Sequence, residues 1–447
     1  MELIYLKEFI KYLMGRRLLK SEIPREYWIY LTTENVKRYD GMKIASQQIT
    51  CTRCGTTYFK QEVKIENQLE AFYYCPECLV MGRVTNRNGL YTLKERLLPS
   101  VSYQHSVSLT WSGRLTVHQK EIANQLVRCY RKKRSVHLVH AVTGAGKTEM
   151  LFLVIKRALA DGKKVGLASP RVDVCLELFP RLKKAFPNET ITLLYGGQDE
   201  LYVWSQFVIC TTHQLLRFYR TFDLLIVDEI DAFPYADNLM LEYGTRQALK
   251  KHGLLIFLTA TPSKKLLAQL TEKEISYLPK RYHGYPLPEP KLVWVYQLKS
   301  KLSRGTIPNP VKTILSHQKR QLLIFFPSIA LMIKNYRHLQ KLYRYKKIAM
   351  VHAQSPNREE LVTAMRQQKI DWLLTTTILE RGVTFPKIDV MIMLANHRVY
   401  TTASLVQIAG RVGRVPNYPT GNVYFVHDGI SLTMKQAQSL IEKMNRE

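Results

Sequence analysis

Short apolar runs alternate with longer amphipathic stretches through most of this 447-residue chain. A first series of runs comprises Val136–Val142, Val165–Ala168, Phe207–Thr211, Leu224–Val227 and Leu254–Leu258. A second series comprises Leu322–Phe326, Ile348–Val351, Trp372–Thr376, Val390–Leu394 and Val423–Val426. Continuous apolar strands that alternate with helices are typical of parallel sheets covered by helices on both faces. The pattern therefore predicts an α/β protein.

The Pro-rich segment Pro286–Pro290 separates the two series and predicts two α/β lobes. We expect an N-terminal region over residues 1–105, a first lobe over 106–288 and a second lobe over 289–447. The start of the chain, Met1–Met14, has apolar residues at helical spacing with charges between them, which predicts an amphipathic helix.

The formal net charge of +30 is the unusual feature of the composition. Such an excess favours an anionic partner, either nucleic acid or an acidic membrane surface. No apolar run approaches the roughly 18 residues that cross a bilayer. The charges in the first residues also argue against a secretion signal. We therefore expect a cytoplasmic protein with no transmembrane segment.

Four of the seven cysteines form two Cys-x-x-Cys pairs, Cys51 with Cys54 and Cys75 with Cys78. Four thiolates complete a closed tetrahedral zinc site that leaves no position for catalysis. We expect a structural zinc module over residues 45–85. The remaining cysteines fall within helix and strand patterns and are expected in the core. They are Cys129, Cys175 and Cys210.

A Gly-rich turn follows the first apolar run and opens a helix, which is the setting of a P-loop. Its residues are Ala141, Val142, Thr143, Gly144, Ala145, Gly146, Lys147 and Thr148, and we expect all of them to bind ATP. Main-chain N–H groups in such a loop surround phosphate oxygens. Lys147 is expected on the β and γ phosphates, and the Thr148 hydroxyl on Mg²⁺.

Acidic residues end the fourth apolar run, at the edge where parallel sheets bind ligands. Asp228 is expected to bind Mg²⁺, and Glu229 to orient and deprotonate the attacking water. In the second lobe, Arg411 and Arg414 are three residues apart and would share one face if the segment were helical. We expect both to stabilise charge on the transferred phosphoryl group.

Together these residues resemble helicase superfamily 2. The segments that carry the resemblance are Leu115–Gln119, 141–148, Ser169–Arg171, Thr211–His213, Asp228–Asp231, Thr259–Thr261, Thr375–Gly382 and Gln407–Arg414. The resemblance implies two RecA-like lobes and a DEAD/DEAH-like ATPase that acts on nucleic acid. It adds Gln119 and Gly382 to the ATP site and Gln407 to the catalytic residues. It implies DNA contacts through Ser169, Arg171, Thr211, Thr212, His213, Thr376 and Thr377.

The four-cysteine module ahead of such a core, with Thr-Thr-Ile-Leu-Glu-Arg-Gly-Val-Thr-Phe-Pro in the second lobe, resembles the ComFA family of late-competence motors. The resemblance implies an ATPase at the inner face of the cell membrane that drives import of transforming single-stranded DNA. It also implies a ComFC-like companion protein and contact with the membrane DNA-uptake channel.

Two other functions are compatible with these motifs. One is a replication-restart or repair helicase that unwinds duplex DNA, which a strand-displacement assay would distinguish from a translocase. The other is a non-catalytic zinc-ribbon protein that binds or scaffolds DNA. The joint presence of Lys147, Asp228, Glu229 and the two arginines argues against the second.

Overall fold

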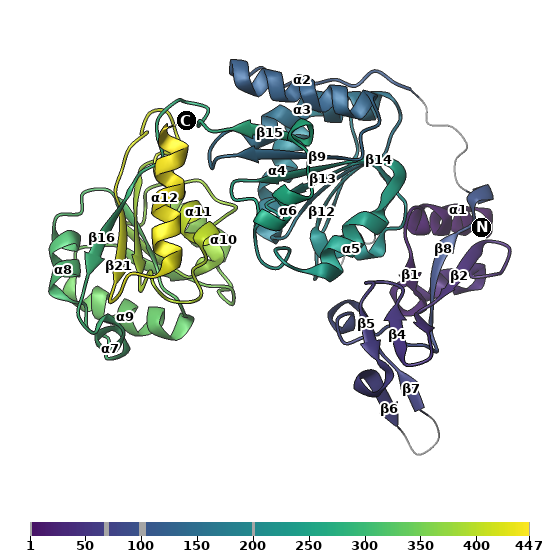
Figure 1. The fold of residues 1–447 in the computed structure, drawn as a ribbon, viewed down its shortest axis with the longest axis horizontal. Coiled ribbons are helices and arrows are strands. Elements are labelled where there is room, and N and C mark those ends of the chain that lie inside the picture. The colour runs from purple at the N-terminus through teal and green to yellow at the C-terminus, as the bar shows by residue number, and fades with distance from the viewer. Residues whose placement is uncertain (1, 67–70, 98–103, 199–201, 447) are drawn as a thin grey trace. The chain divides into compact units, whose positions relative to one another are not determined.

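The computed structural model describes residues 2–66, 71–97, 104–198 and 202–446. Residues 67–70 of the predicted zinc module lie outside this range. The chain divides into two compact units. The first comprises residues 1–139, 148–258 and 270–275, and the second comprises 140–147, 259–269 and 276–447. Figure 1 follows the elements from the purple N-terminus to the yellow C-terminus.

The N-terminal region begins with the expected amphipathic helix, α1 (Glu2–Leu13), which buries Phe9 and Leu13. Three small antiparallel sheets follow, in the orders β1-β8-β2, β3-β4-β5 and β6-β7. Their strands are β1 (Leu18–Leu19), β2 (Val36–Asp40), β3 (Met42–Ile44), β4 (Gln48–Cys51), β5 (Thr57–Phe59), β6 (Lys64–Glu66), β7 (Ala71–Tyr73) and β8 (Gly89–Leu93). Short 3-10 helices connect them: η1 (Lys20–Glu22), η2 (Arg25–Tyr30), η3 (Lys60–Val63), η4 (Leu79–Met81) and η5 (Glu95–Leu97).

A seven-stranded sheet follows, in the order β11-β12-β10-β13-β14-β9-β15. The strands are β9 (Val136–Ala141), β10 (Val165–Ser169), β11 (Ile191–Leu194), β12 (Phe207–Thr211), β13 (Phe222–Asp228), β14 (Leu249–Thr259) and β15 (Ile275–Leu278). The helices are α2 (Val117–Arg131), α3 (Lys147–Ala160), α4 (Val172–Ala185), α5 (Leu239–Ala248) and α6 (Lys264–Ala268), with η6 (Thr212–Arg217) and η7 (Glu272–Glu274). From β11 to β14 neighbouring strands pair in parallel.

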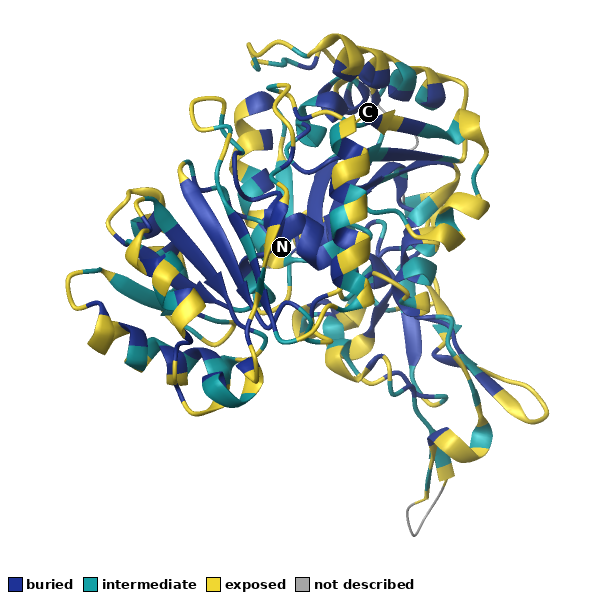
Figure 2. Ribbon diagram, turned by 60° about the vertical axis from the view of Figure 1, so that its left-hand side comes forward, coloured by how far each residue is buried: buried dark blue, intermediate teal, exposed yellow. Residues whose placement is uncertain are grey.

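The second sheet has six strands, all parallel, in the order β16-β21-β20-β17-β19-β18. The strands are β16 (Pro290–Trp294), β17 (Gln321–Phe325), β18 (Ile348–Val351), β19 (Trp372–Thr375), β20 (Ile388–Met393) and β21 (Val423–His427). The helices are α7 (Leu298–Ser303), α8 (Asn309–Ser316), α9 (Ile329–Leu342), α10 (Arg358–Arg366), α11 (Thr402–Ala409) and α12 (Leu432–Arg446), with η8 (Thr377–Leu379). Figure 2 shows the central strands of both large sheets in dark blue, because their side chains are buried on both faces.

The structure confirms the predicted fold class, two RecA-like parallel-sheet lobes with a four-cysteine cluster in the N-terminal region. All ten predicted strands are present. In the two large sheets three further strands, β11, β15 and β16, were not predicted, because their side chains are only partly buried and give no continuous apolar run. In the described part of the chain, no helix combines the length and apolarity needed to cross a membrane.

Candidate nucleotide site and cysteine cluster

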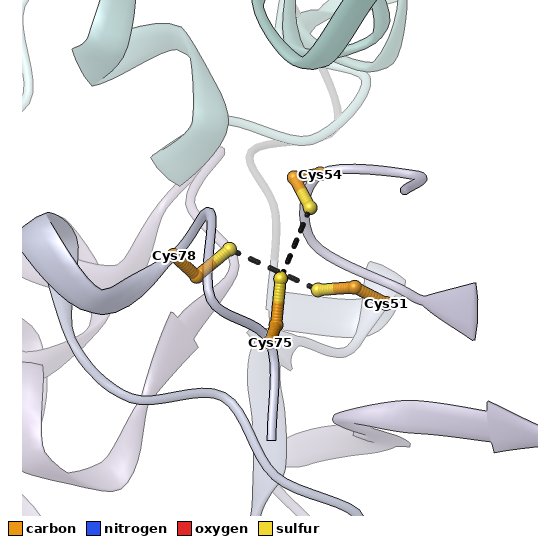
Figure 3. Close-up of side chains that lie close together, drawn as sticks. All are labelled: Cys51, Cys54, Cys75 and Cys78. Carbon is orange, nitrogen blue, oxygen red and sulfur yellow. Dashed lines mark hydrogen bonds between the residues drawn. The ribbon is translucent and has the colours of Figure 1, made fainter. Parts of the chain in front are cut away.

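The four paired cysteines converge on one buried point. Figure 3 shows their side chains pointing toward one another. The Sγ atoms of Cys51 and Cys78 lie 3.8 Å apart and those of Cys54 and Cys75 3.5 Å apart, and all four lie within 4.8 Å of one another. Zinc–thiolate bonds of about 2.3 Å give tetrahedral S···S edges of roughly 3.8 Å. The donor set and its spacing therefore fit a zinc ion.

Tight turns and neighbouring side chains hold these thiols in place. Gly55 has φ of +75°, and the Gly55 N–H donates to the Cys51 carbonyl oxygen over 2.9 Å. The hydroxyl of Tyr58 lies 3.5 Å from Cys75 Sγ. Hydrogen bonds from neighbouring thiols, first of all from Cys51, lower the pKa of Cys54 and favour its thiolate. The three cysteines outside the cluster, Cys129, Cys175 and Cys210, are buried, as expected for core residues.

The carboxylate of Glu22 ties the cysteine cluster to the seven-stranded sheet. Glu22 Oε1 accepts from Arg53 Nη2 over 2.6 Å and from Arg217 Nε over 2.8 Å, and Oε2 accepts from Leu19 N over 2.9 Å. Arg53 precedes the ligand candidate Cys54, and Arg217 ends η6. Burial alone would raise the pKa of Glu22, but the two arginines outweigh it and hold the pKa below its usual value.

The nucleotide loop, residues 141–148, has glycines where its main chain requires them. Gly144 and Gly146 have φ of +83° and +70°, a region that favours glycine. Val142 N donates to Leu278 O over 3.1 Å and so docks the loop on β15. The Thr143 hydroxyl donates to Gln407 Oε1 over 2.9 Å. The structure therefore brings a predicted ATP-binding residue against a predicted catalytic one.

The arginine segment, residues 407–414, is not helical throughout. Helix α11 ends at Ala409, and Gly413 has φ of +70°, so the condition under which Arg411 and Arg414 would share one helix face is not met. Glycines at 410 and 413 provide a physical reason, since neither favours continuing a helix.

Both arginines instead turn toward the residues around Gly382. Arg411 is 1% exposed, and it donates through Nε to Glu380 O over 3.0 Å and through Nη1 to Val383 O. Arg414 is half-buried, with Nη1 at 3.5 Å from Val383 O and 3.4 Å from Thr384 Oγ1. Arg414 is thus the more accessible of the two cations, while Arg411 holds main chain.

The acidic pair stands at the carboxyl end of β13. Asp228 Oδ1 accepts from Glu229 N over 2.8 Å, and both residues are half-buried. Glu229 has φ of +56°, an uncommon conformation for a residue with a side chain, which costs of order 1–3 kcal/mol. Strain of this kind tends to occur at functional sites.

The first-lobe DNA candidates follow the neighbouring strands. The parallel register of β10 and β12 places Ser169 beside Thr211. Ser169, Thr211 and Thr212 are buried, and burial lowers the pKa of the half-buried His213. Arg171 is half-buried and precedes α4. Thr376 and Thr377, which follow β19 of the second sheet, are also half-buried. Arg171, His213, Thr376 and Thr377 are therefore more accessible than the buried residues.

Gln119 has a local role that sequence reasoning missed. It forms a capping box with Thr116 at the start of α2: Thr116 N donates to Gln119 Oε1 over 2.8 Å, and Gln119 N donates to Thr116 Oγ1 over 3.3 Å. The Thr-x-x-Gln spacing ahead of a helix could have revealed it. Its place in the ATP site stays a prediction. Sequence reasoning also missed Arg281, which donates hydrogen bonds to both the nucleotide loop and the arginine segment.

Three protein families match consecutive parts of the chain. Residues 5–92 match the competence protein ComFA N-terminal domain, residues 116–269 the DEAD/DEAH box helicases, and residues 307–416 the helicase conserved C-terminal domain. The chain is 39% identical to competence protein ComFA of Streptococcus pneumoniae, over 97% of this chain and 98% of that protein. It is also 39% identical to competence protein ComFA of Bacillus subtilis, over 98% and 95% respectively.

Solved helicase structures share the fold at low sequence identity. Saccharomyces cerevisiae Dbp5 bound to RNA and ADP BeF3 superposes with a TM-score of 0.58 at 16% identity, covering 74% of this chain and 88% of that one. Mycobacterium smegmatis helicase Lhr bound to ssDNA and AMP-PNP gives 0.55 at 18% identity, covering 73% and 50%.

Proposed function

Because this chain belongs to the ComFA family of competence proteins, and is a helicase superfamily 2 ATPase, we propose that it is a single-stranded-DNA translocase. It binds and hydrolyses ATP and uses the energy to drive import of transforming DNA. The observation that carries the proposal is the contact between the nucleotide loop and the arginine segment, through Thr143 and Gln407. This contact brings the segment that carries Arg414 to the loop that would hold the phosphates, which assistance of hydrolysis by Arg414 requires.

Each step of hydrolysis has a residue of suitable chemistry. Main-chain N–H groups of the nucleotide loop and Lys147 bind the phosphates, and Thr148 and Asp228 hold the Mg²⁺ that neutralises their charge. Glu229 orients the attacking water and accepts its proton. Arg414 stabilises the charge that develops on the γ-phosphoryl group. Arg411 keeps the segment around Gly382 in place through its bonds to Glu380 and Val383.

The DNA contacts are made mainly to phosphates, so they carry no sequence preference. Arg171 and His213 on the first lobe and Thr376 and Thr377 on the second are the accessible candidates. Main-chain amides near the buried Ser169, Thr211 and Thr212 add further donors. The net charge of +30 favours this polyanion.

The cysteine cluster holds a structural zinc ion through Cys51, Cys54, Cys75 and Cys78. A bound ion would cross-link two turns that are distant in sequence. The protein acts at the inner face of the cell membrane, beside the DNA-uptake channel and a ComFC-like companion.

Phosphate release by the purified full-length protein tests the proposal, with no nucleic acid, single-stranded DNA of mixed sequence, duplex DNA or single-stranded RNA. We expect single-stranded DNA to give the largest stimulation. Lys147→Ala should abolish hydrolysis, because the lysine charge on the phosphates is lost, while single-stranded DNA still binds. Hydrolysis that is indifferent to every nucleic acid would refute the motor.

A further inference from the structure

Arg281 joins two parts of the nucleotide machinery through main-chain contacts. It lies in the connection between β15 and β16, with 3% of its surface exposed. Among the described residues, its guanidinium donates only to main-chain carbonyl oxygens. Nε reaches Thr143 O at 3.3 Å, and Nη1 reaches Gly413 O at 2.8 Å. Nη2 reaches Gly410 O at 2.8 Å and Val412 O at 2.9 Å. One side chain thus holds both the nucleotide loop and the arginine segment.

Glycines permit this close approach. A Cβ at Gly144 would lie 3.5 Å from Arg281 Nε, in van der Waals contact. A Cβ at Gly410 would lie 2.8 Å from the Cβ and Cγ2 atoms of Thr143, a clash. Gly413 has φ of +70°, and an added Cβ would also clash with Pro419 O. The backbone around Arg281 is therefore packed too tightly for larger residues at 410 and 413.

The positive charge of Arg281 strengthens its hydrogen bonds to the four carbonyl oxygens. Burial, and next the nearby Arg414, lower the pKa of Arg281 to about 10, so it stays cationic at neutral pH. Within the described residues no carboxylate pairs with it. Hydrogen bonds from a cation are stronger than neutral ones, and a planar guanidinium offers five N–H donors in a fixed arrangement, where a lysine ammonium offers three. His283 adds a further contact, with Nε2 at 3.0 Å from Gly413 O.

We propose that Arg281 is a positioning residue for ATP hydrolysis, acting through Arg414. The carbonyls that it holds belong to the residues on both sides of Arg411 and to the residue directly before Arg414. Fixing these peptide groups fixes the position of the main chain from which the Arg414 side chain extends. The hydrogen bond from Arg281 to Thr143 O fixes the arginine segment relative to the nucleotide loop. This inference rests on the proposed function, since it concerns how that site is assembled.

Steady-state kinetics of the full-length protein with single-stranded DNA tests the proposal. The variants are Arg281→Ala, Arg281→Lys, Arg414→Ala and the double variant Arg281→Ala/Arg414→Ala. Lys280→Ala removes an exposed neighbouring charge and serves as the matched control. Thermal unfolding of each variant reports whether it is folded. Arg281→Lys keeps the charge and most of the volume, so its kinetics test the positioning role if Arg281→Ala does not fold.

The three shorter bonds of Arg281 go to the arginine segment, so the loss should appear in kcat. Misplacement of catalytic groups by about 1 Å costs roughly 10²-fold in rate, and we expect Arg281→Ala to lose about that much. KM for ATP should change by less than about threefold, because ground-state binding is retained. Arg281→Lys should not restore kcat. The double variant should be little slower than Arg414→Ala, because both changes remove the same contribution.

A loss confined to KM, fully additive effects, or wild-type kinetics in folded Arg281→Ala and Arg281→Lys would each overturn the positioning role while leaving the motor intact. Failure of the proposed function differs from failure of the positioning role, because the wild-type protein itself would then show no DNA-stimulated hydrolysis. The positioning role would in that case fail as well.

Discussion

Removing the Glu22 carboxylate should uncouple the cysteine module from the first lobe. Glu22→Ala deletes the acceptor shared by Arg53 and Arg217. The Arg53 side chain has no exposed surface and would remain buried without its counter-charge. Breaking a buried ion pair from one side typically costs about 3–5 kcal/mol. Glu26→Ala removes an exposed carboxylate from the adjacent η2 and is the matched control.

Thermal unfolding by calorimetry measures the effect. For a unit of this size, roughly 2–4 °C is lost per kcal/mol, so Glu22→Ala should lower the first-unit transition by about 6–20 °C. Glu26→Ala should leave it within about 2 °C of wild type. Equal unfolding temperatures for wild type and Glu22→Ala would show that this carboxylate does not hold the module, and equal losses in both variants would show a non-specific charge effect.

The stabilisation by the Glu22 carboxylate should also depend on pH in a defined direction. The pKa of Glu22 is lowered in the folded protein, so its contribution is present above the ordinary glutamate value of about 4.3. That contribution is lost as the pH falls through the lowered pKa. The stability difference between wild type and Glu22→Gln should therefore be largest near neutral pH and shrink in acid. A difference that is constant with pH would contradict the assignment.

Two further predictions follow from the cysteine cluster and from the loop contact. Metal analysis should find one zinc ion per chain, and Cys75→Ser should lose it and increase amide exchange over residues 45–85; a metal-free wild type would contradict the zinc site. Gly410→Ala should slow ATP hydrolysis by roughly 10²-fold, since its Cβ clashes with Thr143. Gly429→Ala, where nothing lies within 4 Å, should hydrolyse ATP normally, and equal rates in both would refute the steric argument.

The sequence predicts those features that repeat or that carry a fixed spacing. Parallel strands give continuous apolar runs, so ten strands of the two large sheets were predictable. The paired cysteines and the P-loop give spacings that few other structures require. Edge strands such as β16, whose side chains are largely exposed, give no such run.

Contacts made by single residues across long sequence separations were not predictable. Arg281 lies in a connecting segment and belongs to no recognisable motif, and its hydrogen bonds go to main-chain carbonyls, which every residue possesses. Glu22 pairs with Arg217, which is remote in the chain. The end of α11 before Arg411 was missed because a motif fixes residue order without fixing backbone conformation.

Movement along single-stranded DNA tests the central claim most directly. Streptavidin is bound to a biotin at one end of an oligonucleotide of mixed sequence, and its displacement is followed with ATP, with a non-hydrolysable analogue and with Lys147→Ala. We predict displacement from one of the two ends, with ATP and the wild-type protein only. DNA-stimulated hydrolysis without displacement from either end would contradict a translocating motor.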